Sequence, residues 1–234
     1  MLTNYESKSY AGEPDAGLQG GLNITDVADP ADPKHVHFWP YDKSGLHRFT
    51  YDGRYAYISP ELEGYVGNIV MILDIKDPSR PVEVGRWHMP GQWIAGGEEP
   101  TWEADAHRCY HPIRMGNRLY TSYWHGGFVI LNINDMSIPK FVSDLDGPAL
   151  RVPDPHLPAD PVRYRGRKWM VVADKDAGAL WTQHPGAMLW MVNIIDETNP
   201  IPVATDQLDP ENLSPRSGCH QPAEDVKGTE IPVA

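Results

Sequence analysis

A short pattern occurs four times in this chain and constrains its fold more than any other feature. In each copy an apolar run ends at an Asp or Asn, and a proline follows seven positions later. The four pairs are Asp26 and Pro33, Asp74 and Pro81, Asn132 and Pro139, and Asn193 and Pro200. Successive anchors lie 48, 58 and 61 residues apart. A repeat of this length made of strand segments is typical of a β-propeller, in which each copy forms one blade.

A second strand-like segment precedes most of the anchored runs. Aromatic and β-branched residues alternate in segments 54–59, 117–122 and 167–172, each of which follows a glycine, and segment 228–233 is a weaker copy. Such alternation indicates half-buried strands. The chain also contains 23 prolines and 21 glycines, which favour short elements and tight turns over long helices. We therefore predict an all-β fold of repeated antiparallel sheets.

The repeats divide the chain into about four blade units. Their approximate bounds are 1–41 together with 219–234, 42–92, 104–147 and 156–210. In one interpretation the C-terminal strand completes the N-terminal blade, which closes a ring and removes exposed sheet edges. In the other, the chain is part of a longer, seven-bladed-type propeller. Because four blades are few for a propeller, the second interpretation is favoured.

Composition excludes several classes of partner. The net charge is −12 and basic residues are scattered, so we expect no nucleic-acid partner. No apolar run approaches 18 residues, so no membrane span is expected. The first residues lack the basic and then apolar pattern of a signal peptide, which favours a cytoplasmic setting.

Histidines recur at one place in the repeat. One lies six to ten residues before the turn glycine of a unit, at His47, His107, His156 and His220. Residues that enter the first strand of different blades converge near a propeller axis, and neutral imidazole is a common ligand of transition metals. We therefore predict an axial site for a divalent transition metal such as Fe, Cu, Mn or Zn. His111 competes with His107 as the ligand from its unit, and for each histidine a hydrogen-bonded turn residue is the alternative.

Two further residues are candidates for catalysis. Glu103 lies in the long connection before His107, where a carboxylate can orient a metal-bound imidazole. His125 follows a strand segment and could act as an acid or base, although a structural role is equally consistent with its place. Aromatic residues near these positions, Trp102, Tyr110 and Trp124, favour a small organic substrate over a polymer.

The anchored runs resemble a known repeat. Segments 69–75 and 127–133 resemble the LVIVD repeat, the signature of a bacterial and archaeal β-propeller family, and segment 156–172 resembles its His-led inner strand. That family is similar in architecture to selenium-binding protein and methanethiol oxidase, and more distantly to the carotenoid-cleavage oxygenases. The resemblance implies a metal held by histidines at the axis. It extends to four positions of this chain, His47, His107, His156 and His220.

Two functional hypotheses follow from these patterns. The first is a metal-binding propeller that acts as a metal-dependent oxidoreductase on a small organic substrate. The alternative is a non-catalytic propeller scaffold that binds a protein or peptide partner on one rim. Homo-oligomer formation is compatible with either hypothesis.

Overall fold

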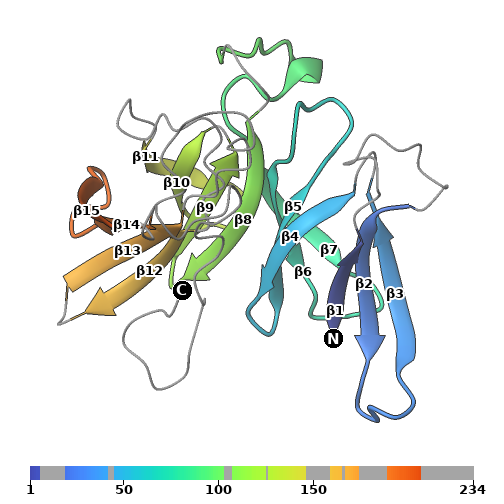
Figure 1. The fold of residues 1–234 in the computed structure, drawn as a ribbon. Helices are drawn as coiled ribbons and strands as arrows, with labels where there is room; N and C mark the ends of the chain where they lie inside the picture. The colour runs from blue at the N-terminus through green and yellow to red at the C-terminus, as the bar shows by residue number, and fades with distance from the viewer. Residues whose placement is uncertain are drawn as a thin grey trace, which may run out of the picture. The chain divides into compact units, whose positions relative to one another are not determined.

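The structure is a computed structural model, and it describes residues 1–5, 19–41, 45–102, 107–124, 126–145, 159–164, 167–173 and 189–206. These residues form 15 β-strands and a short 3-10 helix, η2 (Ile94–Gly96) (Figure 1). The predicted all-β fold is confirmed. No helix in the described part of the chain has the length and apolar character needed to cross a bilayer.

The strands form four antiparallel sheets, in which sequential strands are neighbours. The first contains β1 (Leu2–Tyr5), β2 (Gly21–Asp26) and β3 (Lys34–Pro40). The second contains β4 (Leu46–Tyr51), β5 (Tyr55–Pro60), β6 (Val70–Asp74) and β7 (Val82–Trp87). The third contains β8 (Arg108–Met115), β9 (Arg118–Trp124), β10 (Gly127–Asn132) and β11 (Lys140–Leu145). The fourth contains β12 (Ala159–Tyr164), β13 (Arg167–Ala173), β14 (Leu189–Asn193) and β15 (Ile201–Asp206).

The repeated Asp/Asn anchor is the last residue of the penultimate strand of each sheet, and it starts the turn to the outer strand. Asp74 Oδ1 accepts a hydrogen bond from the N–H of Lys76 (2.8 Å), and Asp77 Oδ1 accepts one from the N–H of Ser79 (3.0 Å). The same pair of turns occurs in the other three sheets, with acceptors at Asp26 and Asp29, Asn132 and Asp135, and Asn193 and Asp196. Short side-chain acceptors stabilise such turns locally, which explains why the anchors are Asp or Asn.

Each outer strand contains a β-bulge at the same place, opposite the residues just before the anchor. The register shifts between Ile72 and Leu73 in the second sheet, and at the equivalent positions of the other three. The extra residue is always a valine ten positions after the anchor, namely Val36, Val84, Val142 and Val203. A bulge increases the local twist of a strand pair, so the four sheets share this bend as well as their turns.

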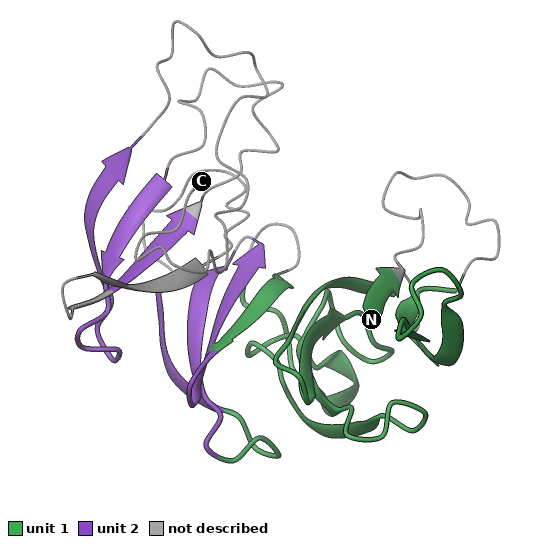
Figure 2. Cartoon of the chain, turned by 90° about the horizontal axis from the view of Figure 1, so that it is seen from below, with its two compact units in different colours: residues 1–114, 135–139 green, residues 115–134, 140–234 purple. Residues whose placement is uncertain are grey.

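The chain divides into two compact units (Figure 2), and each has its own core. Unit 1 contains residues 1–114 and 135–139, and its core includes Leu22, Leu46, Ile58 and Leu73. Unit 2 contains residues 115–134 and 140–234, and its core includes Tyr120, Phe128, Met170 and Val192. All eight residues lie on strands at buried positions, which matches the apolar segments of the repeat.

Each unit contains a contact of the same type, between an outer strand and an Asp/Asn turn. A Cβ at Gly85 on β7 would lie 2.2 Å from the carbonyl oxygen of Met136, so the turn 135–139 packs directly on this strand. At the equivalent position of β11, the Ser143 hydroxyl donates a hydrogen bond to the carbonyl of Glu197. Met136 and Glu197 each lie four residues after their anchors. In the second and third sheets, the turn of the next repeat therefore packs on the outer strand at the small residue that follows the bulge valine.

Candidate functional site

Two of the candidate histidines lie against the same tyrosine in unit 1. The rings of His47 on β4 and Tyr110 on β8 are 4.8 Å apart between centroids, with an interplanar angle of 54°. The rings of Tyr110 and His111 are 6.4 Å apart and nearly perpendicular. Tyr110 and His111 are both buried. Strands β4 and β8 are also joined by a hydrogen bond from the Thr50 hydroxyl to the Pro112 carbonyl (2.7 Å).

The surroundings of His111 keep its imidazole neutral. Burial, and to a smaller extent the nearby Arg48 and His47, lower the pKa of His111 to about 4, while a hydrogen bond with the Phe49 backbone partly opposes the change. At neutral pH this side chain is therefore an uncharged imidazole. A neutral imidazole can donate a lone pair to a metal or accept a proton.

Arg48 and Ser59 fix the position of Tyr110. The guanidinium of Arg48 donates to the Tyr110 hydroxyl (3.4 Å) and lies 5.6 Å from the centre of its ring. The buried Ser59 hydroxyl accepts a hydrogen bond from the Arg48 N–H (2.9 Å) and lies 3.1 Å from the Tyr110 carbonyl. The cluster of His47, Arg48, Tyr110 and His111 is called the Tyr110 cluster below.

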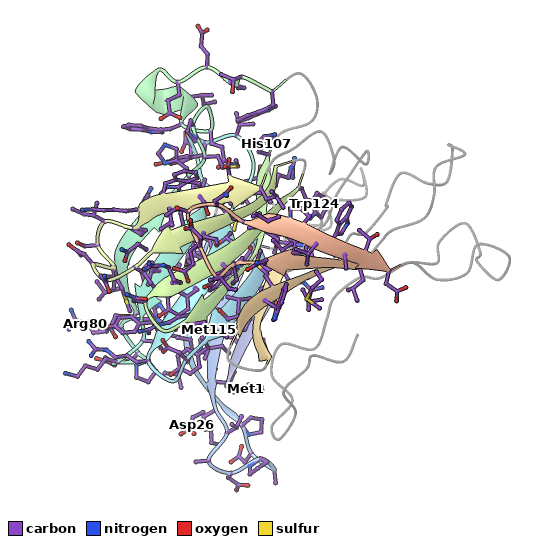
Figure 3. All side chains as sticks on the ribbon, turned by 90° about the vertical axis from the view of Figure 1, so that its left-hand side faces the viewer. Met1, Asp26, Arg80, His107, Met115 and Trp124 are labelled. Atoms are coloured by element: carbon purple, nitrogen blue, oxygen red, sulfur yellow. The ribbon has the colours of Figure 1, made fainter. Side chains whose placement is uncertain are left out.

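His107 lies in a different environment, directly before β8 (Figure 3). Its ring stacks on Trp102 with centroids 4.5 Å apart and an interplanar angle of 17°. Its carbonyl accepts a hydrogen bond from the buried amide of Gln92 (2.9 Å), which also donates to the carbonyls of Val66 and Asn68. Of the two competing candidates in this unit, His111 and not His107 accompanies His47 at Tyr110.

The other residues of the predicted site lie outside the described residues. These are the metal candidates His156 and His220 and the catalytic candidates His125 and Glu103. Within the described ranges, no group of three His, Cys, Asp or Glu side chains is arranged to hold a metal ion. Burial raises the pKa of the Cys109 thiol well above its usual value, so it remains protonated next to the Tyr110 cluster in sequence.

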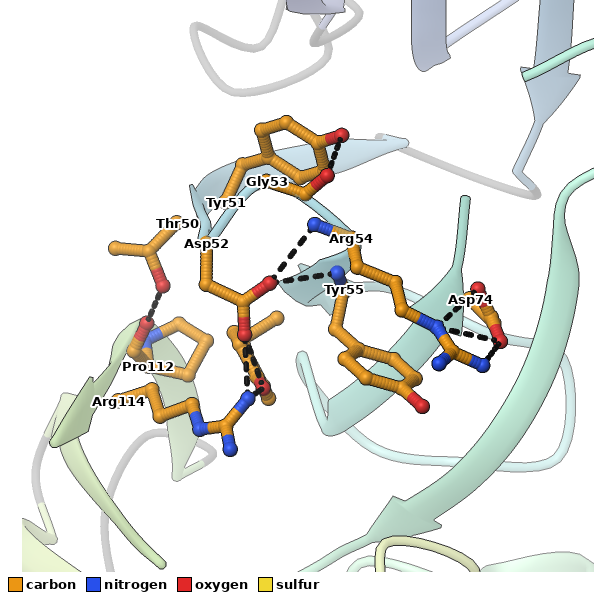
Figure 4. Close-up of polar contacts among 10 residues, drawn as sticks. Thr50, Tyr51, Asp52, Gly53, Arg54, Tyr55, Asp74, Pro112 and Arg114 are labelled. Atoms are coloured by element: carbon orange, nitrogen blue, oxygen red, sulfur yellow. Dashed lines mark hydrogen bonds and ion pairs between the residues drawn. The ribbon is translucent and has the colours of Figure 1, made fainter. Parts of the chain in front are cut away.

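A polar network lies at the turn between β4 and β5 (Figure 4). Asp52 accepts hydrogen bonds from the N–H groups of Arg54 (3.0 Å) and Tyr55 (2.7 Å), from the Tyr57 hydroxyl (2.9 Å) and from Arg114. Burial alone would raise the pKa of Asp52, but these hydrogen bonds outweigh it and hold the pKa below its usual value. The network ties the β4–β5 turn to β8, and it keeps the two strands of the Tyr110 cluster in place.

In the connection between β7 and β8, a glutamate side chain holds the backbone, and two large apolar side chains nearby are exposed. The Glu98 carboxylate accepts hydrogen bonds from the N–H groups of Gly91 (2.8 Å) and Trp93 (3.1 Å) and lies 3.1 Å from the His88 ring. Next to this brace, the side chains of Trp93 and Ile94 are 42% and 48% exposed. Two large apolar side chains are thus held at the surface by a fixed loop.

Comparison with known proteins agrees with the repeat pattern. The LVIVD repeat family matches residues 51–88. This segment contains β5, β6 and β7 and the two hydrogen-bonded turns at Asp74 and Asp77. The chain carries an LVIVD repeat. No curated protein matches the chain. The matched segment contains Ser59, whose hydroxyl contacts the backbone of Arg48 and Tyr110, and Asp52, which accepts a hydrogen bond from Arg114.

The sequence did not single out Arg48 or Gln92. Arg48 follows a candidate ligand directly, and Gln92 lies in a long connection without strand alternation. Their roles depend on contacts with Tyr110 and with three backbone carbonyls that are distant in sequence. Contacts between residues that are distant in the sequence produce no regular spacing from which they could be predicted.

Proposed function

We propose that this protein is a metal-binding β-propeller in which His47 and His111 supply two imidazole ligands to a divalent transition metal. The observation that carries the proposal is the buried, neutral His111, which like His47 lies against Tyr110, since only a neutral imidazole can coordinate a metal. Two imidazoles do not complete a coordination sphere, and His156 and His220 are the residues that we propose for the rest.

The residues around the two histidines favour particular metal ligands and a particular way of binding a substrate. The protonated Cys109 thiol disfavours a thiolate ligand, so an imidazole-rich set is the best fit. The cationic Arg48 weakens metal binding by charge repulsion, but its guanidinium is directed to the Tyr110 hydroxyl, where it can also hold an anionic group of a substrate. A bound metal would supply Lewis-acid or redox chemistry. We propose oxidation of a small organic substrate as the activity, with Arg48 and Tyr110 as binding residues.

Elemental analysis of protein purified without a histidine tag tests the metal. We expect about one equivalent of a transition metal in the wild type and a clear loss in His111→Leu. His35→Leu on the exposed part of β3 is the matched control and should retain the metal. His107→Leu distinguishes the two candidates, because its ring stacks on Trp102 and not on Tyr110. Equal metal content in wild type and His111→Leu would contradict the proposal.

The alternative is a non-catalytic propeller scaffold that binds a peptide on one rim. The exposed Trp93 and Ile94 on their braced loop favour this candidate. It predicts a metal-free protein in which Trp93→Ala abolishes partner binding while His111→Leu has no effect on it. Glu98→Gln, which weakens the brace, should lower the affinity without removing either apolar side chain.

A further inference from the structure

The four outer strands differ in how well their bulge is covered, although their sequences place it identically. The bulge valines Val36, Val84 and Val142 are half-buried, whereas Val203 on β15 is 49% exposed. The small residue that follows is buried at Gly85 and Ser143 but exposed at Ala204. The fourth sheet therefore presents at its surface a position that is covered in the second and third sheets.

The covering element is known in those two sheets. In both cases it is the Asp/Asn turn of the next repeat, and the contact is made by the carbonyl four residues after the anchor, at Met136 over Gly85 and at Glu197 over Ser143. β15 has the same bulge, and Ala204 is likewise a small residue directly after the bulge valine. A turn of this type is thus the occupant that its shape fits.

The first sheet presents an exposed turn of this type. Residues 26–35 are exposed throughout, and Asp26 lies at the projecting end of the sheet (Figure 3). The turn has the same geometry as the two docked turns, because Asp26 and Asp29 accept hydrogen bonds from Ala28 (2.8 Å) and Ala31 (3.0 Å). By the same count from the anchor, Pro30 supplies the docking carbonyl.

We propose that the protein self-associates head to tail, with the 26–33 turn of one copy docked on the β15 bulge of a second copy. The two surfaces are different and complementary, so the contact is heterologous and leaves one surface of each kind available at the ends of a dimer. It covers Val203 and Ala204, whose equivalents on β7 and β11 are half-buried and buried, respectively. This inference does not depend on the proposed metal site.

Light scattering coupled to size exclusion tests the association. The wild type should show a mass that rises with concentration above the 26.2 kDa of one chain. Ala204→Arg on β15 and Ala31→Arg on the turn should each reduce the mass to that of a monomer. Thr205→Arg is the matched control, since adjacent strand residues point to opposite faces and this variant should still associate.

Mixing the two monomeric variants tests directly whether the turn of one copy binds β15 of another. Ala204→Arg retains an intact turn, and Ala31→Arg retains an intact β15, so an equimolar mixture should form a 1:1 dimer and nothing larger. Dimer formation also demonstrates that both variants are folded. A wild type that remains monomeric at all concentrations would overturn the proposal. So would a mixture that fails to dimerise while both variants melt like the wild type, because the turn would then have another binding site or none.

Discussion

At the scale of single residues, His111 and Arg48 determine the chemistry that the Tyr110 cluster can perform. His111 is buried and next to a guanidinium, so protonating it would add a second positive charge without solvent to stabilise it. This environment keeps a lone pair available at neutral pH. The recurring place of histidines in the sequence predicted candidates, but it did not show which one has this environment.

The depressed pKa of His111 predicts a pH-dependent stability in metal-free protein. The unfolded chain takes up a proton at His111 below its ordinary pKa of 6.5, whereas the folded protein does so only near pH 4. The free energy of unfolding should therefore fall as the pH decreases from about 6.5 to about 4, by at most about 3 kcal/mol, and change little from this source below that range.

Urea unfolding at a series of pH values measures this effect. His111→Leu should remove that part of the pH dependence, and His35→Leu on β3 should keep it. The same slope in His111→Leu and in the wild type would show that His111 is not the group that titrates.

At the scale of elements, the repeat is a strand, a double Asp/Asn turn and a bulged outer strand. The anchors and prolines predicted the turns correctly because their interactions are local: each acceptor bonds to an N–H two residues later. The valine at the bulge is just as regular in the sequence. The strand register shows that this valine is the extra residue of a β-bulge. The sequence does not show this, because a bulge is defined by pairing with the partner strand.

The contact between β7 and the 135–139 turn predicts a large effect of a small substitution. In Gly85→Ala the new Cβ would lie 2.2 Å from the Met136 carbonyl oxygen and 2.9 Å from the Cα of Ser137, and backbone atoms cannot move aside cheaply. We expect a loss of about 1–3 kcal/mol in the free energy of unfolding.

Thermal and urea unfolding provide the measurement for Gly85→Ala. The matched control is Ala204→Ser, which places the Ser143 side chain at the equivalent, exposed position of β15 and should change stability by less than about 0.5 kcal/mol. A neutral Gly85→Ala would mean that the turn does not pack on β7 in solution.

At the scale of the whole molecule, the two units have separate cores and separate polar anchors. In unit 1 the Asp52 network includes Arg114 and Tyr57. In unit 2 the Glu197 carboxylate accepts hydrogen bonds from Arg118 (2.7 Å) and from the Tyr120 hydroxyl (2.9 Å). The Glu197 side chain is only 12% exposed, so its ion pair is shielded from solvent.

This separation predicts that Glu197→Gln acts on one unit only. Loss of the charge leaves Arg118 partly buried beside a neutral amide, which should destabilise unit 2 by about 2 kcal/mol. Hydrogen exchange measured by mass spectrometry should become faster in β9, β10 and β14 and remain unchanged in β2 and β5.

Glu83→Gln in unit 1 is the control for this experiment. Glu83 forms an ion pair with Arg86 at the surface, where such pairs contribute about 0–1 kcal/mol. Faster exchange throughout both units in Glu197→Gln would show that they unfold as one.

The all-β class, the four strand-and-turn repeats and the positions of their turns could be predicted from the sequence, because these depend on contacts within a few residues. The sequence also predicted His47 and His111 as candidates. The placement of His111 with His47 at Tyr110, and of His107 on Trp102, became apparent from the fold and not from the sequence. The physical reason is that β4 and β8 are 62 residues apart at the Thr50 to Pro112 hydrogen bond, and the packing of two strands, not their spacing in the chain, brings their side chains together.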